Sequence, residues 1–156
     1  PKPQNPMQIV IISLVNMQDF EGASLIDNTQ NAQTVADSVK VVGIYFSAHW
    51  CPPCRGFTPT LATAYNEANA NGKVFEVVFA TSDQDENQFK NYHASMPWLA
   101  LNFGDELIKT LKTKYSVSGI PKLVIFKKSN GDILSDNGRG DIAQNGAGAI
   151  AGWANQ

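Results

Sequence analysis

The chain has 156 residues and a formal net charge of -2, and this length is enough to bury one core without structural disulfides or metals. We therefore expect a single domain over residues 1–156, with residues 1–37 as an N-terminal extension. The 12 basic and 14 acidic residues are scattered, so no basic stripe is present to bind nucleic acid. The two cysteines lie close together, which suits a reducing compartment, and we expect a cytoplasmic monomer, with the nucleus as the alternative location.

An apolar run over residues 7–15 is the first predicted element, and it includes four consecutive β-branched residues from Ile9 to Ile12. The run has little positive charge before it and is too short to span a bilayer, so we interpret it as a buried strand or packed segment rather than a targeting signal. No membrane partner is expected. After a polar turn over residues 27–31, residues 35–39 are predicted to form a short helix.

A β-branched and aromatic run over residues 41–46 predicts a central strand that is buried on both faces. It leads into the motif WCPPC at residues 50–54. Apolar residues then recur at helical spacing over residues 53–70, which predicts a helix that begins at the motif. Pro59 lies inside this helix and removes a backbone donor, so a kink is expected there.

The second half of the chain continues the alternation of strands and helices. Residues 74–80 form a second predicted strand, and Ser82 or Asp83 is expected to cap a helix that carries Phe89 and Tyr92. A further helix is predicted from a stripe of apolar side chains, which comprises Leu107, Ile108, Leu111 and Tyr115. We interpret four aromatic side chains at core spacing as core: Phe57, Tyr65, Phe89 and Tyr92.

The C-terminal part is predicted to contain a hairpin and one last helix. Strands over residues 123–126 and 133–134 are joined by a turn with an Asn-Gly step. The final helix would be lined by Ile142, Ala149, Ile150 and Trp153, although its glycines weaken it. Strands that alternate with helices and end in a hairpin predict an α/β protein with a mixed sheet covered on both faces.

The chemistry of the chain is concentrated in the WCPPC motif. Two thiols at this spacing can close to a disulfide and reopen without moving the fold. At the start of a helix, free backbone N–H groups and the macrodipole favour a thiolate on Cys51, which predicts that Cys51 is the nucleophile. Cys54 follows on the next turn as the resolving thiol, and Pro52 and Pro53 stiffen the ring. Trp50 is either a contact surface beside the nucleophile or a core residue.

Other interpretations of the two cysteines fit less well. A zinc site needs four ligands, and only His49 and His93 could add nitrogen donors, so no metal is expected. An inert disulfide would close too small a loop to stabilise the fold appreciably. His49 is interpreted as an exposed turn residue rather than a base. The glycines near the C-terminus do not form a dinucleotide fingerprint, and we expect no bound cofactor.

Two further segments bear on the site. Pro121 precedes a strand, and a cis bond there would turn the chain so that the backbone of Ile120 could meet an extended peptide. Met96, Pro97 and Trp98 are interpreted as a packed loop near the active face.

Four stretches carry a resemblance to a known family: VVGIYFSAHWCPPCRGFTPTL from Val41, FEVVFATSDQDE from Phe75, MPWLAL from Met96 and SGIPKLVIF from Ser118. Over roughly residues 38–135 the chain resembles the tryparedoxin and nucleoredoxin branch of the thioredoxin superfamily. The resemblance implies a thioredoxin fold with an N-terminal β extension and a disulfide exchange reaction with protein partners.

The resemblance also implies roles for individual residues. Cys51 matches the nucleophile, Cys54 the resolving thiol and Pro121 a cis-proline. Residues matched to substrate binding are Trp50, Pro52, Pro53, Ile120, Pro121 and Arg139. Two positions depart from related patterns: Gln84 stands where tryparedoxins have an acidic residue, and Tyr45 stands where thioredoxins proper have a buried acid. A phenol is a poor base near neutrality, so another group must take the Cys54 proton.

Together these features predict a thiol–disulfide oxidoreductase that maintains redox balance. Its electrons would come from a low-molecular-weight dithiol or a reductase and pass to protein disulfides, with peroxiredoxins as expected clients. The alternative is a nucleoredoxin-like binding module that regulates a partner protein according to its own redox state.

Overall fold

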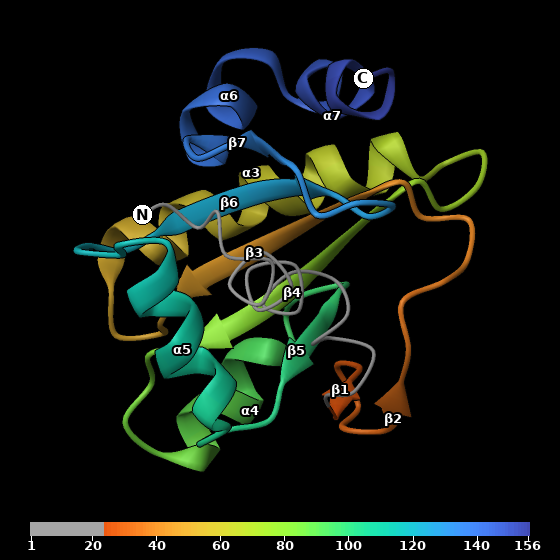
Figure 1. The fold of residues 1–156 in the computed structure, drawn as a ribbon. Coiled ribbons are helices and arrows are strands. Elements are labelled where there is room, and N and C mark those ends of the chain that lie inside the picture. The colour runs from red at the N-terminus through yellow and green to blue at the C-terminus, as the bar shows by residue number, and fades with distance from the viewer. Residues whose placement is uncertain (1–23) are drawn as a thin grey trace, which may run out of the picture.

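The computed structural model describes residues 24–156, so the predicted element over residues 7–15 lies outside the described residues. Seven strands form one mixed sheet in the order β2-β1-β5-β4-β3-β6-β7 (Figure 1). The strands are β1 (Leu25–Ile26), β2 (Ala32–Gln33), β3 (Val41–Ser47), β4 (Phe75–Thr81), β5 (Leu99–Leu101), β6 (Lys122–Lys127) and β7 (Ile133–Ser135). The helices are α3 (Pro52–Ala68), α4 (Glu86–His93), α5 (Glu106–Lys114), α6 (Gly138–Asn145) and α7 (Ala147–Ala154).

β3 lies at the centre of the sheet and leads directly to the cysteine motif. It pairs in parallel with β4 and antiparallel with β6, so its backbone groups are satisfied on both edges. All seven of its residues are buried, as their apolar sequence predicts. The predicted hairpin between residues 123 and 134 is confirmed as β6 and β7, and Gly131 in its turn has a φ of 79°.

Two hydrophobic clusters cover the two faces of the sheet. Alternate side chains of the central strands divide between them, with Tyr45 and Phe79 on one side and Ile44 and Val78 on the other. The first cluster also holds side chains of α3, α4, α6 and α7, whereas the second holds those of α5. Figure 1 shows α3, α6 and α7 gathered on one side of the sheet and α5 on the opposite side. The expected thioredoxin fold with helices on both faces is confirmed.

The N-terminal β extension is also confirmed within the described residues. β1 pairs antiparallel with both β2 and β5, so this short hairpin widens the sheet at its edge. The helix predicted over residues 35–39 is wrong. The segment forms a turn closed by a 3.1 Å bond from the Val39 N–H to the Ala36 carbonyl. Five residues are too few to nucleate a helix without a strong apolar face.

Three other details differ from the sequence predictions. Asp85, not Ser82 or Asp83, caps α4, and its carboxylate accepts a 2.8 Å bond from the Gln88 N–H. The single final helix that was predicted is two helices in the structure. Gly146, with a φ of 54°, interrupts the helical backbone between α6 and α7. The three-residue strand β5 follows directly after Trp98 and was not predicted.

Within residues 24–156 no helix is long and apolar enough to cross a membrane.

Candidate active site

Cys51 is the N-cap residue of α3, at the point where the chain leaves β3. Its sulfur accepts a 3.4 Å bond from the Cys54 N–H, one of the free amides of the first helical turn. The thiol also faces the Ile120 carbonyl oxygen at 3.8 Å. The side chain is only 5% exposed, so a partner must approach the sulfur from one side. The helix start that the motif predicts is therefore present and points at this sulfur.

Cys54 lies in the first turn of the same helix and is completely buried. Pro52 and Pro53 occupy the first two helical positions, where their missing N–H groups have no helical partner to lose. Burial is the largest effect that raises the pKa of Cys54 to about 11, and its hydrogen bond with Cys51 acts in the same direction. Both cysteines are free thiols in this structure. Cys54 is thus held as a protonated thiol within reach of Cys51.

An exposed apolar rim, formed by Trp50, Pro52 and Pro53, surrounds Cys51. The Trp50 side chain is 51% exposed, which excludes the alternative that it belongs to the core. Its indole N–H donates to the Ser82 carbonyl at 3.2 Å. This bond orients the ring without burying it, so the rim offers a contact surface beside the nucleophile.

The turn that carries His49 and Trp50 is fixed from two sides. The Asp83 carboxylate accepts a 2.7 Å bond from the His49 N–H, and Arg55 donates to the His49 carbonyl at 2.8 Å. The His49 side chain is exposed and stacks on Tyr92 with ring centroids 5.2 Å apart. The prediction that His49 is an exposed turn residue is confirmed.

The Ile120–Pro121 peptide bond is cis, as the resemblance implied. It immediately precedes β6 and brings the Ile120 carbonyl next to Cys51. Ile120 packs against the small cluster that holds both cysteines, while Pro121 is buried. A segment 69 residues away in sequence therefore completes the surroundings of Cys51.

A layer of buried hydroxyl groups lies beneath Cys54. Thr58 donates to the Cys54 carbonyl at 2.9 Å and lies 2.8 Å from the Tyr45 hydroxyl and 2.7 Å from the Tyr92 hydroxyl. The Tyr92 hydroxyl also lies 2.8 Å from Ser47. Sequence reasoning predicted buried rings for the tyrosines but missed this hydroxyl layer, because periodicity shows which face a side chain occupies and not what its polar tip contacts. Met96 and Trp98, predicted to be packed, are both buried in the adjacent core.

Two further residues singled out in the sequence are exposed. Arg139 is exposed in the first turn of α6. Gln84 is exposed between the end of β4 and the start of α4. The structure thus brings together Trp50, the CPPC segment, Ile120 and Pro121, while the role of Arg139 stays a prediction.

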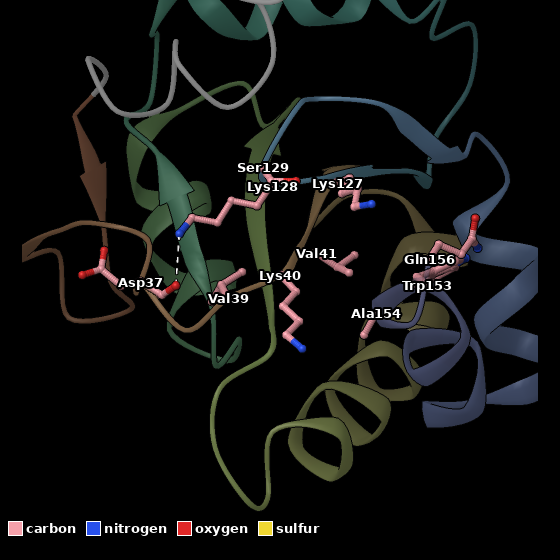
Figure 2. Close-up of a pocket in the computed structure, with 10 residues that line it drawn as sticks. All are labelled: Asp37, Val39, Lys40, Val41, Lys127, Lys128, Ser129, Trp153, Ala154 and Gln156. Carbon is pink, nitrogen blue, oxygen red and sulfur yellow. Dashed lines mark hydrogen bonds between the residues drawn. The ribbon is translucent and has the colours of Figure 1, made fainter.

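A cavity of about 590 Å³ lies at the other end of β3, next to Val39, Val41 and Trp153 (Figure 2). Figure 2 shows the side chains of Lys127 and Lys128 pointing away from each other, and Lys128 is engaged by the Asp37 carbonyl at 3.4 Å. These cations do not converge on one point. The cavity contains none of the predicted site residues and is separated from the cysteines by the length of the strand.

No group of three or more metal-ligating side chains is present in the part of the chain from residue 24 onward. The site offers two thiols, backbone donors and acceptors, and hydroxyl groups. Such a site can attack a disulfide through Cys51, form a mixed disulfide and release it through Cys54, with no redox group other than sulfur.

Comparisons with known proteins agree with this geometry. A sequence model described as thioredoxin-like matches residues 38–133. The chain is 38% identical over 122 residues to the nucleoredoxin of Danio rerio, covering 78% of this chain and 29% of that protein. It is 40% identical over 117 residues to the tryparedoxin of Trypanosoma brucei brucei, covering 74% of this chain and 81% of that one.

A solved structure gives the same result. Tryparedoxin II complexed with glutathionylspermidine superposes with a TM-score of 0.71 at 36% identity, over 79% of this chain and 86% of that one. The chain spans less than a third of the length of the nucleoredoxin, but most of the length of the tryparedoxins. It belongs to the thioredoxin-like family, in the branch that contains the tryparedoxins and nucleoredoxins.

Proposed function

We propose that this protein is a thiol–disulfide oxidoreductase that reduces protein disulfides. The observation that carries the proposal is the position of Cys51 at the N-cap of α3, with the Cys54 N–H directed at its sulfur at 3.4 Å. A helix start is the environment that makes a cysteine nucleophilic, and thioredoxin-type motifs are the examples on which that rule rests.

The reaction has two steps. The Cys51 thiolate attacks one sulfur of the client disulfide, a new S–S bond forms, and the second client sulfur leaves with the electron pair. The Cys54 sulfur then attacks Cys51, which breaks the mixed disulfide and releases the first client sulfur. The Cys54 proton ends on this departing sulfur or in water. The client gains two electrons, and a Cys51–Cys54 disulfide remains.

The oxidised protein must then recover two electrons from a donor thiol. A low-molecular-weight dithiol or a reductase is the proposed donor, supported by the likeness to a tryparedoxin that was solved in complex with glutathionylspermidine. Peroxiredoxins are the proposed clients, because their catalytic cycle produces a disulfide that such a protein can reduce. This cycle fits a reducing compartment, and we propose the cytosol or the nucleus.

The apolar rim supports a protein client rather than a small disulfide alone. Trp50, Pro52 and Pro53 are exposed beside Cys51, and the Ile120 carbonyl oxygen lies 3.8 Å from the Cys51 sulfur. An extended peptide can accept side-chain contact from the rim and pair its backbone with Ile120. Arg139, exposed in the first turn of α6, is a proposed contact for the donor or client.

The test is reduction of insulin, and of an oxidised peroxiredoxin in a coupled assay, with trypanothione, glutathione and thioredoxin reductase compared as donors. We expect turnover by the wild-type protein with at least one donor, none by Cys51→Ser, and a stable mixed disulfide with the client in Cys54→Ser. Wild-type turnover retained in Cys51→Ser would overturn the proposal.

A redox-sensing binding module is the second candidate, and the match to nucleoredoxins favours it. In this function the rim would hold a partner without reducing it. A variant that lacks both cysteines separates the two candidates. Equal capture of a partner by this variant and by Cys54→Ser indicates a binding module, whereas capture by Cys54→Ser alone indicates disulfide reduction.

A further inference from the structure

The exposed ring of Trp50 is bonded to a backbone carbonyl from another part of the chain. Its indole N–H donates to the Ser82 carbonyl at 3.2 Å, and Ser82 lies in the loop between β4 and α4. An exposed ring without such a bond can occupy several rotamers, and fixing one of them before a partner arrives reduces the entropy that binding costs. The residues that fix Ser82 therefore help to fix the surface that the rim offers to a client.

Three elements of the fold hold Ser82. Its N–H donates to the Ser47 carbonyl at the end of β3 at 2.9 Å, and its carbonyl accepts the bond from Trp50. Its hydroxyl accepts a 2.5 Å bond from the side chain of Lys112 in α5. Because α5 covers the face of the sheet opposite to α3, this bond joins the helix on the far face to the loop beneath the rim (Figure 1).

The side chain of Ser82 lies at a cavity and not within the packed core. The cavity has a volume of about 380 Å³ and is lined by residues 81–83, residues 103–105 and α5. Side chains cannot pack closely against Ser82 on the cavity side, so a hydrogen bond has to support it there. A bond with a charged donor is about twice as strong as a neutral one, which suits Lys112 to this task. Lys112 is half-buried at the cavity, whereas Lys109 lines it but is exposed.

The neighbouring Asp83 has a different task in the same loop. Its carboxylate accepts a 2.7 Å bond from the His49 N–H, so it holds the backbone of the turn that carries Trp50. Ser82 instead bonds to the ring itself. The position of the turn and the orientation of the ring are thus set by two consecutive residues, and α5 supports only the second of them through Lys112.

We propose that Lys112 is a positioning residue for client recognition: it holds Ser82, and Ser82 holds the Trp50 ring in the orientation that a protein client meets. The proposal rests on the disulfide reduction proposed above and concerns binding of the client, not the exchange at the two sulfurs. Loss of Lys112 should therefore raise KM for a protein disulfide and leave kcat unchanged.

Solvent exchange of the Trp50 indole proton tests the structural half of the proposal without any client. In the ¹⁵N-labelled protein the Trp50 indole signal is assigned by its loss in Trp50→Phe, and its exchange is measured by magnetisation transfer from water. The hydrogen bond must open before the proton exchanges, so Lys112→Met should speed exchange about threefold. Lys112→Arg, which keeps a charged donor, should restore part of the protection. Wild-type exchange in Lys112→Met would overturn the proposal.

Two controls belong to the same spectra. Lys109→Met removes a cation from the same helix and the same cavity, and it should leave the Trp50 exchange rate unchanged. The indole signals of the buried Trp98 and Trp153 should keep their positions in Lys112→Met, which shows that the core is intact. Equal acceleration by Lys109→Met and Lys112→Met would assign the effect to charge and overturn the proposal.

Insulin reduction tests the functional half. Lys112→Met is expected to raise KM about threefold with kcat unchanged, and Lys109→Met to change neither. In a Trp50→Ala background the further change Lys112→Met should have no effect, because the ring through which Lys112 acts is absent. A second threefold increase in that background would show that Lys112 acts by another route and would overturn the proposal.

A small disulfide separates the rim from the sulfur. Hydroxyethyl disulfide needs no contact with the rim, so reduced Lys112→Met should react with it at the wild-type rate, measured as loss of protein thiols after an acid quench. Slower reaction would place the effect of Lys112 at Cys51 and overturn the proposal. Failure of the wild-type protein to reduce any disulfide would instead contradict the proposed function, and the exchange of the indole proton would still decide whether Lys112 orients the ring.

Discussion

Cys51 and Cys54 lie three positions apart, yet their surroundings differ in kind. Cys51 is surrounded by backbone groups and an exposed rim, whereas Cys54 is completely buried above side-chain hydroxyls. The backbone groups are available to any helix start that follows a strand, but the hydroxyls must be supplied by particular residues on β3, α3 and α4. The difference supports the proposal that Cys51, at the start of α3, is the attacking thiol and that Cys54, above the core, is the resolving thiol.

Truncation of a side chain in the buried layer beneath Cys54 is expected to have the largest effect on the protein. Tyr45 is fully buried and its ring packs 5.9 Å from the rings of both Phe57 and Trp98. Tyr45→Ala removes this ring and is expected to lower the free energy of unfolding by about 3–5 kcal/mol. Urea denaturation followed by fluorescence measures the loss. Tyr45→Phe, which keeps the ring, should cost about 1 kcal/mol, and equal losses in the two variants would contradict this account.

Asp83 ties the turn that carries His49 and Trp50 to the end of β4. Its carboxylate accepts bonds from the His49 N–H at 2.7 Å and from the Thr81 hydroxyl at 2.8 Å. Asp83→Ala leaves both donors without this partner and is expected to destabilise the protein by about 1–3 kcal/mol. Because the His49–Trp50 turn also loosens, client reduction should fall at a temperature where the variant remains folded. Full activity in the folded variant would show that the bond does not position the rim.

Removal of the rim itself should affect activity without affecting stability. Trp50→Ala is expected to lower kcat/KM for a protein disulfide about tenfold, or ~1.4 kcal/mol. Its free energy of unfolding should stay within about 0.5 kcal/mol of the wild type, because the side chain is exposed. Trp50→Phe, which restores a flat apolar group, should recover part of the loss. A large loss of stability in Trp50→Ala would show that this side chain belongs to the core after all.

The buried His93 and the exposed His49 are expected to affect the pH dependence of stability differently. His93 is fully buried, its ring contacts the Trp98 carbonyl at 2.8 Å and Gln30 at 3.2 Å, and burial lowers its pKa below 6.5. Protonation therefore favours the unfolded state. The stability that comes from burying neutral His93 is fully present above the pKa of the unfolded histidine, about 6.5. It is lost as the pH falls below that value.

Urea midpoints at pH 7.5 and 5.5 test this prediction. The midpoint should be lower at pH 5.5, and the difference should shrink in His93→Gln but persist in His49→Gln, because His49 is exposed. A difference that persists unchanged in His93→Gln would assign the pH dependence to other groups.

Local signals were sufficient to predict the central strand, the helix that starts at the cysteines and the Asn-Gly hairpin. The predicted cap of α4 was wrong, because Asp83 and Asp85 are equally good caps by residue type. Asp83 is instead used by the His49 turn, which only the tertiary structure shows. Gly146 could have been predicted to end the helix, because glycine adopts a positive φ such as its observed 54° more readily than other residues.

The site divides in the same way. The WCPPC motif at residues 50–54 was sufficient to predict Cys51, Cys54 and the rim. The family resemblance was needed to predict the cis bond of the Ile120–Pro121 pair. Ser47, Thr58 and Tyr92 could not be identified in advance, because single hydroxyl residues on three separate elements carry no spacing signal. Arg139 also follows from the family resemblance alone, and the structure places it in the first turn of α6.

Limited alkylation of the reduced protein tests the central claim, that the two thiols have different roles, most directly. The protein is treated at pH 7 with less than one equivalent of iodoacetamide, quenched in acid and mapped by mass spectrometry. We predict modification of Cys51 while Cys54 remains free, because Cys54 is completely buried and its pKa is raised to about 11. Modification of Cys54 first, or of both cysteines at equal rates, would contradict the account.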